Sequence, residues 1–128
     1  MRSPDAPVVV VEFSDLECPA CKQFHSELKD AANDLHSNIG LVMLHYPLSI
    51  HRFANAAARA LECASSAGVP GPFVDVAFAK QDSFGLKPWI EYAKEAGVID
   101  TASFQSCIRS TDRVKRIDRG RFLGDSMG

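Results

Sequence analysis

Two cysteines three positions apart, Cys18 and Cys21, are the residues of this chain best suited to chemistry. They follow an apolar run at residues 8–13 and open a stretch, 22–35, in which apolar residues recur at helical spacing. At the first turn of a helix, unpaired backbone N–H groups and the partial positive charge of the helix end favour a thiolate. The spacing also places both sulfurs on one helix face, where they can form a disulfide with each other. The pattern therefore predicts a redox-active cysteine pair.

Two other uses of these cysteines have to be compared with the redox site. The pair could be a structural disulfide or two inert thiols, but a position at a helix start favours function. Together with His25 the cysteines form a C-x2-C-x3-H pattern, which offers three ligands for zinc. A structural zinc site needs a fourth ligand, and the sequence has no second C-x2-C or H-x3-H pair. We therefore expect no metal here and a His25 that packs on the helix.

The composition limits the function classes. A chain of 128 residues is long enough for one domain with one core. Its net charge of -2 gives no electrostatic argument for binding nucleic acid or an anionic membrane, and no apolar run approaches the ~20 residues that span a bilayer. Residues 1–5 contain no apolar segment of a signal peptide. The chain is thus expected to be either a cytosolic protein or a mature domain whose leader lies outside it.

The first third of the chain predicts a β-α-β unit. Residues 8–13 and 41–46 are the two strand candidates, the helix lies between them, and Gly40 is expected to form a turn before the second strand. The continuous β-branched run at 8–11 is typical of a strand covered on both faces of a parallel sheet. The crossover should be right-handed.

After residue 50 the sequence predicts helices only. The expected segments are 53–67, 73–80, 87–96 with Pro88 as the first helical residue and Gly97 as the stop, a helix capped by Asp100, and a last helix capped by Ser110 or Thr111 and ended by Gly124. The aromatic residues Phe73, Trp89 and Tyr92 are expected in the core of this helical part. Two strands make a poor sheet. Either the helices cover an unusually small sheet or further strands are missing from this chain.

An ordered series of residues resembles the DsbA-like branch of the thioredoxin superfamily, and it covers nearly the whole chain. A C-x-x-C pair beside a β-α-β pattern is itself typical of thioredoxin-like redox sites. The series comprises residues 4–7, 13–25, 46–51, 56–64, 92–97 and 104–108. The resemblance implies an α/β thioredoxin-like fold, residues 1–128, with a redox half at 1–50 and a helical insertion with its returning helix at 51–124.

The resemblance also implies roles for individual residues. Cys18 takes the role of the nucleophile, Cys21 that of the resolving and more buried thiol, and Glu12 that of a buried acid six residues before Cys18. Since burial favours the protonated form of a carboxyl, Glu12 could pass a proton to or from Cys21. The alternative is a glutamate at the strand edge that points to solvent; the flanking valines and phenylalanine favour burial.

Cys63 and Cys107 are the other two cysteines, and both fall on predicted helices. Free buried cysteine is one reading, because cysteine behaves as a small hydrophobe. The even cysteine count and the resemblance favour a disulfide between them, which would indicate an oxidising compartment. The resemblance thus places the protein in the periplasm or elsewhere outside the cytoplasm.

The function that follows is thiol–disulfide exchange on protein substrates, most simply as a disulfide-forming oxidase, with a further redox partner that resets the pair and no cofactor. A reductase or isomerase is the first alternative. A non-catalytic module is the second, because the family continues with a Thr-Pro pair whose cis proline faces the disulfide, a hairpin and a closing helix, which we expect to be missing here. Oligomeric state is left open. His36, His45 and His51 show no nucleophile–base spacing with another group, and His51 is interpreted as a surface or capping residue. The basic residues of the last helix are interpreted as a solvated face whose charge is diluted by Asp112 and Asp118: Arg113, Lys115, Arg116, Arg119 and Arg121.

Overall fold

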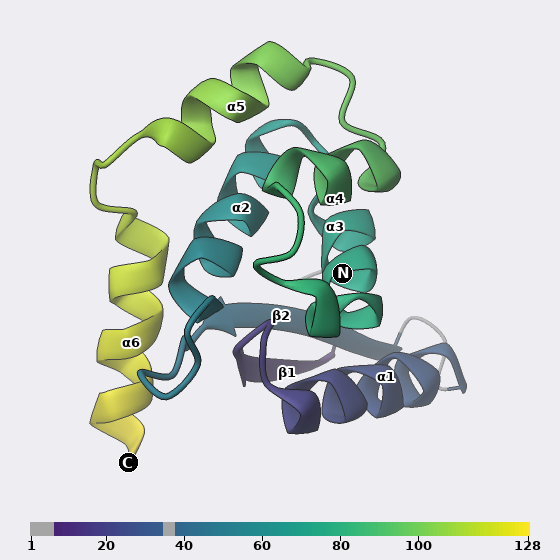
Figure 1. Ribbon diagram of the computed structural model, residues 1–128. Coiled ribbons are helices and arrows are strands. Elements are labelled where there is room, and N and C mark those ends of the chain that lie inside the picture. Colours follow the sequence, from purple (N-terminus) through teal and green to yellow (C-terminus); the bar gives the residue numbers. More distant parts are fainter. Residues whose placement is uncertain (1–6, 35–37) are drawn as a thin grey trace.

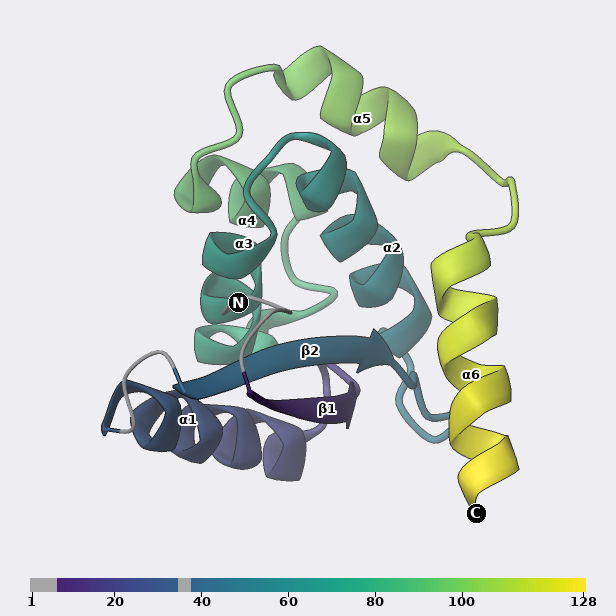
Figure 2. The same cartoon turned by 180° about the vertical axis from the view of Figure 1, so that it is seen from behind.

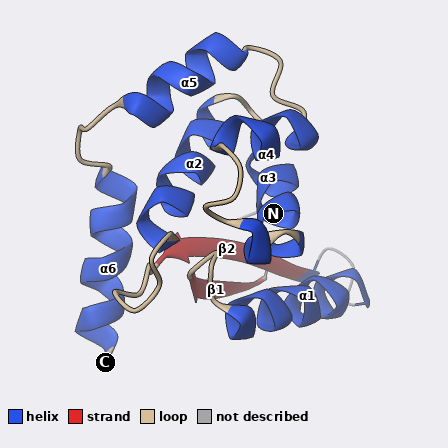
Figure 3. Cartoon of the chain, viewed as in Figure 1, coloured by secondary structure: helices blue, strands red, loops and turns tan. Residues whose placement is uncertain are grey.

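The computed structural model describes residues 7–34 and 38–128, and its elements follow one another as two strands and six α-helices within these ranges (Figure 1). They are β1 (Val8–Ser14), α1 (Pro19–Asp34), β2 (Ile39–His45), α2 (Ala54–Ser66), α3 (Pro70–Ala79), the short 3-10 helix η2 (Gln81–Ser83), α4 (Trp89–Ala96), α5 (Thr101–Arg109) and α6 (Lys115–Met127). Helices dominate after residue 50, as the sequence predicts (Figure 3). None of the described helices is both long and apolar enough to cross a bilayer.

The sheet consists of β1 and β2, which run parallel with Val8 opposite Ile39 and Ser14 opposite His45. Both strands were predicted, but Gly40 is a strand residue paired with Val9 and not a turn. We also predicted that other elements pack on both faces of β1, and this is wrong for the first part of the strand. Val8 and Val11 are 54% and 48% exposed, because no described element packs over them.

The core lies between the sheet and a block of helices formed by α2, α3 and α4 (Figures 1 and 2). Most alanines of α2 are almost completely buried, and their small side chains allow close helix packing: Ala54, Ala57, Ala58, Ala60 and Ala64. As predicted, Phe73 and Tyr92 lie fully inside, and Trp89 packs on the same cluster against Phe84. The helical block therefore provides most of the apolar burial that two strands alone cannot supply.

Helix ends agree with the sequence where a local signal marks them. Asp100 accepts a hydrogen bond from the Ser103 backbone N–H and caps α5, and Gly97 ends α4 with a left-handed φ of 100°.

Two helix starts differ from the prediction. Pro88 precedes α4 in an extended conformation and is not its first residue. The third helix begins at Pro70, three residues before the predicted start, since Pro70 fits the first helical turn.

The last helix differs most from its prediction. α6 begins at Lys115 and continues through Gly124 to Met127. Both glycines of α6 serve close packing: a Cβ on Gly120 would lie 2.0 Å from the His45 carbonyl oxygen, and one on Gly124 would lie 2.5 Å from the Tyr46 ring. Gly124 was read as a helix stop, yet it is the residue that lets α6 approach Tyr46, whose hydroxyl donates a hydrogen bond to Asp125.

The apolar face predicted for the first helix is only partly buried. Ala32 is buried, whereas Phe24 is 50% exposed and Ala31 is exposed. Leu35 lies outside the described residues. The covered side of α1 is instead the side that carries Cys21, His25 and Leu28, which are half-buried.

A partly buried charge cluster joins β2, α2 and α6, and it should make the stability sensitive to acid. His45, which is buried, contacts Glu62 with its Nε2 2.6 Å from Oε1, and Arg116 lies 3.6 Å from the same oxygen. Burial raises the pKa of Glu62, but the His45 hydrogen bond and the charges of His45 and Arg116 outweigh it and hold this pKa below its usual 4.5.

A carboxyl with a lowered folded-state pKa adds stability that is present above about pH 4.5 and is lost as the pH falls through the folded-state value. Glu62→Gln should therefore lower the urea midpoint at pH 7, and the difference from the parent should shrink between pH 4.5 and pH 3. Glu91→Gln, which removes an exposed pair with Lys94, is the control and should change little. A difference independent of pH would contradict the assignment.

Candidate active site

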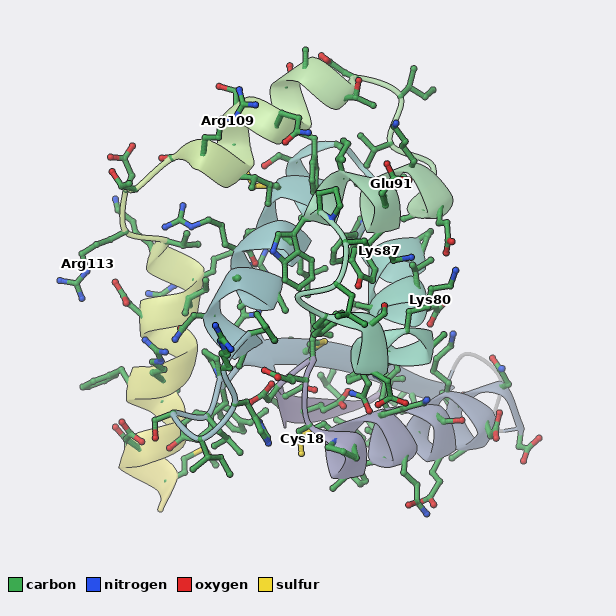
Figure 4. All side chains as sticks on the ribbon, in the orientation of Figure 1. Cys18, Lys80, Lys87, Glu91, Arg109 and Arg113 are labelled. Atoms are coloured by element: carbon green, nitrogen blue, oxygen red, sulfur yellow. A yellow bond between two sulfur atoms is a disulfide. The ribbon has the colours of Figure 1, made fainter. Side chains whose placement is uncertain are left out.

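The two candidate cysteines lie where the chain passes from β1 into α1. The Cys18 carbonyl accepts the first helical hydrogen bond, from the Lys22 N–H at 3.1 Å, so Cys18 caps the helix and Pro19 is its first residue. Pro19 costs no hydrogen bond there, because the first N–H groups of a helix have no partner in the helix. Both thiols are free, and both cysteines are half-buried. Figure 4 shows Cys18 at the start of α1, with its side chain directed outward, away from the helical block.

Cys21 packs against the hydrophobic core. Burial is the main cause that raises the pKa of Cys21, to about 11, and the neighbouring Cys18 sulfur raises it further. The Asp15 backbone and the Ser14 hydroxyl act in the opposite direction. A thiol held in its protonated form is a poor attacking group until a base removes its proton.

Glu12 is buried, with 4% of its surface exposed, which confirms the predicted burial. Its Oε2 lies 2.9 Å from His25 Nδ1, and its Oε1 has no hydrogen-bond partner among the described residues. His25 also packs against the Phe78 ring at 5.2 Å between centroids. The described residues contain no group of three or more His, Cys, Asp and Glu side chains arranged to hold a metal ion. The contact between Glu12 and His25 is not apparent from the sequence, although His25 was expected to pack on the helix.

The loop between β1 and Cys18 is held by a buried carboxylate that the sequence analysis missed. Asp15 accepts hydrogen bonds from the Glu17 and Leu48 backbone N–H groups, each at 2.8 Å, and its Oδ2 lies 2.7 Å from His51 Nδ1. Glu17 in turn accepts from the Phe53 N–H. His51 was expected to be a surface or capping group, but it binds this loop. The only local sign of this role in the sequence was the presence of two acidic residues, Asp15 and Glu17, directly after the first strand.

A second anchor comes from far along the chain. Gln81 is buried and donates to the carbonyl oxygens of Leu16 at 2.9 Å and Cys18 at 3.3 Å. The helical block therefore fixes the backbone that presents Cys18, and the site is preorganised by residues from three parts of the sequence.

A family model described as Thioredoxin matches residues 3–120. This chain belongs to the thioredoxin family. Among solved structures similar to it is DsbA2 of Pseudomonas aeruginosa, 28% identical, with a TM-score of 0.77 over 99% of this chain and 71% of that chain. DsbA of Chlamydia trachomatis, 17% identical, shares the fold with a TM-score of 0.79 over 99% of this chain and 71% of that one. The DsbA-like, thioredoxin-like fold expected from the sequence is confirmed.

Curated relatives of this thioredoxin-family chain are much longer than it is. It is 34% identical over 96 residues to the Na(+)/H(+) antiporter NhaA 3 of Salinispora tropica, which is 73% of this chain and 15% of that protein. With the NhaA of Herminiimonas arsenicoxydans it shares 30% over 120 residues, 93% of this chain and 19% of that protein. The likeness thus concerns a small part of each antiporter.

The other two cysteines of the thioredoxin-family chain are joined. Cys63 on α2 and Cys107 on α5 form a disulfide with Cα atoms 5.8 Å apart, and Cys63 is almost fully buried. The bond ties α5 to the helical block, and α5 lies at the opposite end of the molecule from α1, where the free pair is found (Figure 1).

The remaining candidates lie away from this site. Arg113 is 86% exposed and pairs with Asp118 at 3.0 Å, as expected for a solvated face, while Arg116 contacts Glu62. Lys115 and Arg119 are exposed, and Arg121 donates to Asn55. His36 lies outside the described residues.

Proposed function

We propose that this chain catalyses thiol–disulfide exchange on protein substrates through Cys18 and Cys21. The observation that carries the proposal is the asymmetry of the pair: Cys18 caps the helix with its carbonyl and directs its side chain outward, whereas Cys21 packs against the core and its thiol has a raised pKa. Such an asymmetry suits one sulfur for intermolecular attack and the other for resolution. The similarity to DsbA proteins supports this reaction class.

In the oxidising direction, a substrate thiolate attacks the Cys18 sulfur of the Cys18–Cys21 disulfide. The new bond joins the substrate to Cys18, and Cys21 leaves as a thiolate that takes up a proton. A second substrate thiolate then attacks the first substrate sulfur and releases Cys18. The substrate loses two electrons and two protons, and the cysteine pair gains both.

Glu12 is proposed to supply and remove the Cys21 proton. It is the buried carboxyl of β1 near the site, and one of its oxygens is unpaired. A carboxyl held in place beside a reacting group can act as a general acid or base.

We further propose that the pair forms disulfides and works outside the cytoplasm. The bond between Cys63 and Cys107 favours an oxidising compartment. Its partners would be reduced polypeptides and a second redox protein that reoxidises Cys18 and Cys21. Ala20, between the cysteines, brings no charge or donor that would favour the Cys18 thiolate, so we expect a milder oxidant than a pair with histidine at this position.

A glutathione redox titration, read by alkylation and peptide mass mapping, tests the proposal. Cys18 and Cys21 should interconvert reversibly as a pair, while Cys63 and Cys107 stay joined throughout. A potential near ~-120 mV would indicate an oxidase, whereas one near ~-270 mV would indicate a reductase. If Cys18 paired preferentially with Cys63 or Cys107, the site assignment would be wrong.

One observation favours a second candidate, a substrate-binding module without turnover. The outer side of β1 exposes apolar side chains, so part of the sheet is uncovered in the described structure. Turnover of a reduced, unfolded protein by this chain would exclude that candidate.

A further inference from the structure

Gln81 is the buried polar side chain that connects the helical part of the chain to the reactive cysteine. It belongs to the short helix η2 between α3 and α4, 63 positions after Cys18, and only 7% of its surface is exposed. A buried amide costs free energy unless its N–H groups find acceptors. The Gln81 side-chain nitrogen donates to two main-chain carbonyls, those of Leu16 at 2.9 Å and Cys18 at 3.3 Å. Both hydrogen bonds therefore go to the turn that leads into the cysteine pair.

The backbone of Cys18 depends on this amide for a contact that its own neighbourhood does not supply. Its other hydrogen bonds are local: the Cys18 N–H donates to the Asp15 carbonyl, and the Cys18 carbonyl accepts from the Lys22 N–H, both at 3.1 Å. Among the described residues, Gln81 is the one group distant in sequence that hydrogen-bonds this backbone. It therefore fixes the peptide group that directly follows the reactive side chain.

The η2 turn that carries Gln81 is attached to α4. The Ser83 hydroxyl lies 2.7 Å from the Tyr92 hydroxyl, and Tyr92 is fully buried. Phe84, directly after η2, packs edge-on against the rings of Trp89 and Tyr92, with centroids 4.9 and 5.5 Å apart. The amide of Gln81 thus extends from a base that is fixed in the core.

The orientation of the Cys18 backbone decides where its sulfur lies relative to the start of α1. Cys18 directly precedes Pro19, the first residue of the helix, and its sulfur can accept hydrogen bonds from N–H groups of the first turn only while its backbone keeps this cap geometry. These N–H groups and the helix dipole favour a thiolate. Both thiols are free in the structure, so the hydrogen bonds from Gln81 are present in the reduced form.

We propose that Gln81 is a positioning residue that stabilises the reduced, dithiol form of the Cys18–Cys21 pair more than its disulfide form. It acts through the Cys18 carbonyl, and the inference rests on the proposed function in that it takes this pair as the redox-active one. Stabilisation of the reduced form makes the disulfide a stronger oxidant. A residue of the helical block thus sets part of the driving force with which the pair takes electrons from a substrate.

A purely structural anchor would behave differently. If Gln81 stabilised the two redox forms equally, its removal would lower the unfolding free energy of both by the same amount and leave the redox equilibrium unchanged. If it acts as proposed, its removal destabilises the reduced form more and shifts the equilibrium toward the disulfide. Folding and reduction form one thermodynamic cycle, so the difference between the two losses must equal the shift of the redox equilibrium.

The test compares the whole chain with its Gln81→Met variant, in which a side chain of similar length lacks the N–H donors. In the equilibrium that is measured, the disulfide and two glutathione thiols give the dithiol and one glutathione disulfide. At pH 7 this equilibrium should shift about tenfold toward the Cys18–Cys21 disulfide, which corresponds to a potential ~30 mV more negative. Urea unfolding of the oxidised and the reduced forms, with Cys63 and Cys107 joined in both, should give losses that differ by the same factor.

Gln23→Met is the matched control, because Gln23 is exposed on α1 and donates to Glu27 at 3.1 Å, one turn further along the helix. This variant should keep the parental equilibrium. Gln81→Leu fills the buried site with a branched apolar side chain and should show the same shift as Gln81→Met, so the result does not depend on the folding of one variant.

A parental equilibrium in the folded Gln81 variants, or equal losses of unfolding free energy in the two redox forms, would overturn the proposal and leave Gln81 as a structural anchor. An equal shift in Gln23→Met would also count against it, since the effect would then not depend on the contact with Cys18. Failure of the proposed function has a different signature: the parent would not turn over a reduced, unfolded protein, while the effect of Gln81 on the glutathione equilibrium would remain.

Discussion

Replacing Cys18 with serine should reduce exchange on a protein substrate to the uncatalysed level, a loss of about 1000-fold or more. The hydroxyl of serine cannot act as the attacking or attacked sulfur, and the other free thiol, Cys21, packs against the core. Cys21→Ser should give a different result, because Cys18 can still be attacked but the adduct can no longer be resolved from within the chain. Mixed disulfides between Cys18 and substrate should therefore accumulate. Non-reducing electrophoresis and mass mapping of the adduct measure both outcomes.

The matched control replaces Cys63 and Cys107 together with alanine. This variant loses a disulfide but keeps the free pair at the start of α1, so exchange below its unfolding temperature should be close to that of the parent. Adducts mapped to Cys63 or Cys107, or full activity in Cys18→Ser, would contradict the assignment of Cys18 as the nucleophile.

The elements that sequence alone located are those set by local rules. An apolar β-branched run gave β1, helical spacing with a capping aspartate gave α5, and the alanine-rich segment at 54–66 gave α2. Asp100 illustrates why: its side chain caps the helix through Ser103, three residues away. Signals of this kind need no knowledge of the rest of the chain.

The predictions from sequence are wrong where packing against a distant part of the chain overrides the local preference of a residue. Gly124 has the residue type of a helix stop, but in α6 it provides room for the Tyr46 ring, which is 78 positions away. Gly40 likewise enters β2 because β1 pairs with it. The exposed valines of β1 have the opposite cause: their pattern specifies a covered strand, but the described structure has no element over them.

The same division applies to the site. Cys18 and Cys21 could be selected from sequence because motif and spacing mark them, and Glu12 because of the resemblance to the DsbA-like branch. Their roles remain predictions. The residues that hold the backbone around these side chains could not be selected from the sequence. Gln81 reaches Cys18 from 63 positions away, and His51 reaches Asp15 from 36. Only the fold brings these residues together.

Removing the second disulfide should be the most destabilising change outside the free pair. The bond between Cys63 and Cys107 closes a segment with a sequence separation of 44, for which the chain-entropy relation gives about 4 kcal/mol of stabilisation. Burial of Cys63 adds to the effect, since an alanine there leaves unfilled space beside the core. The double alanine variant should therefore lose about 2–5 kcal/mol of unfolding free energy in urea.

The control for this variant replaces the free cysteine pair, Cys18 and Cys21, in place of the bonded pair. Cys18→Ala with Cys21→Ala removes two thiols that lie half-buried at one helix end and close no long loop, so its unfolding free energy should differ little from that of the reduced parent. Equal losses in the two double variants would contradict the argument, because they would mean that cysteine packing, and not the crosslink, carries the stability. A loss confined to the Cys63 and Cys107 variant would show instead that the helical block depends on its crosslink. It would then be this block, held together by the disulfide, that presents Gln81 to Cys18 and keeps the backbone of the reactive cysteine in place.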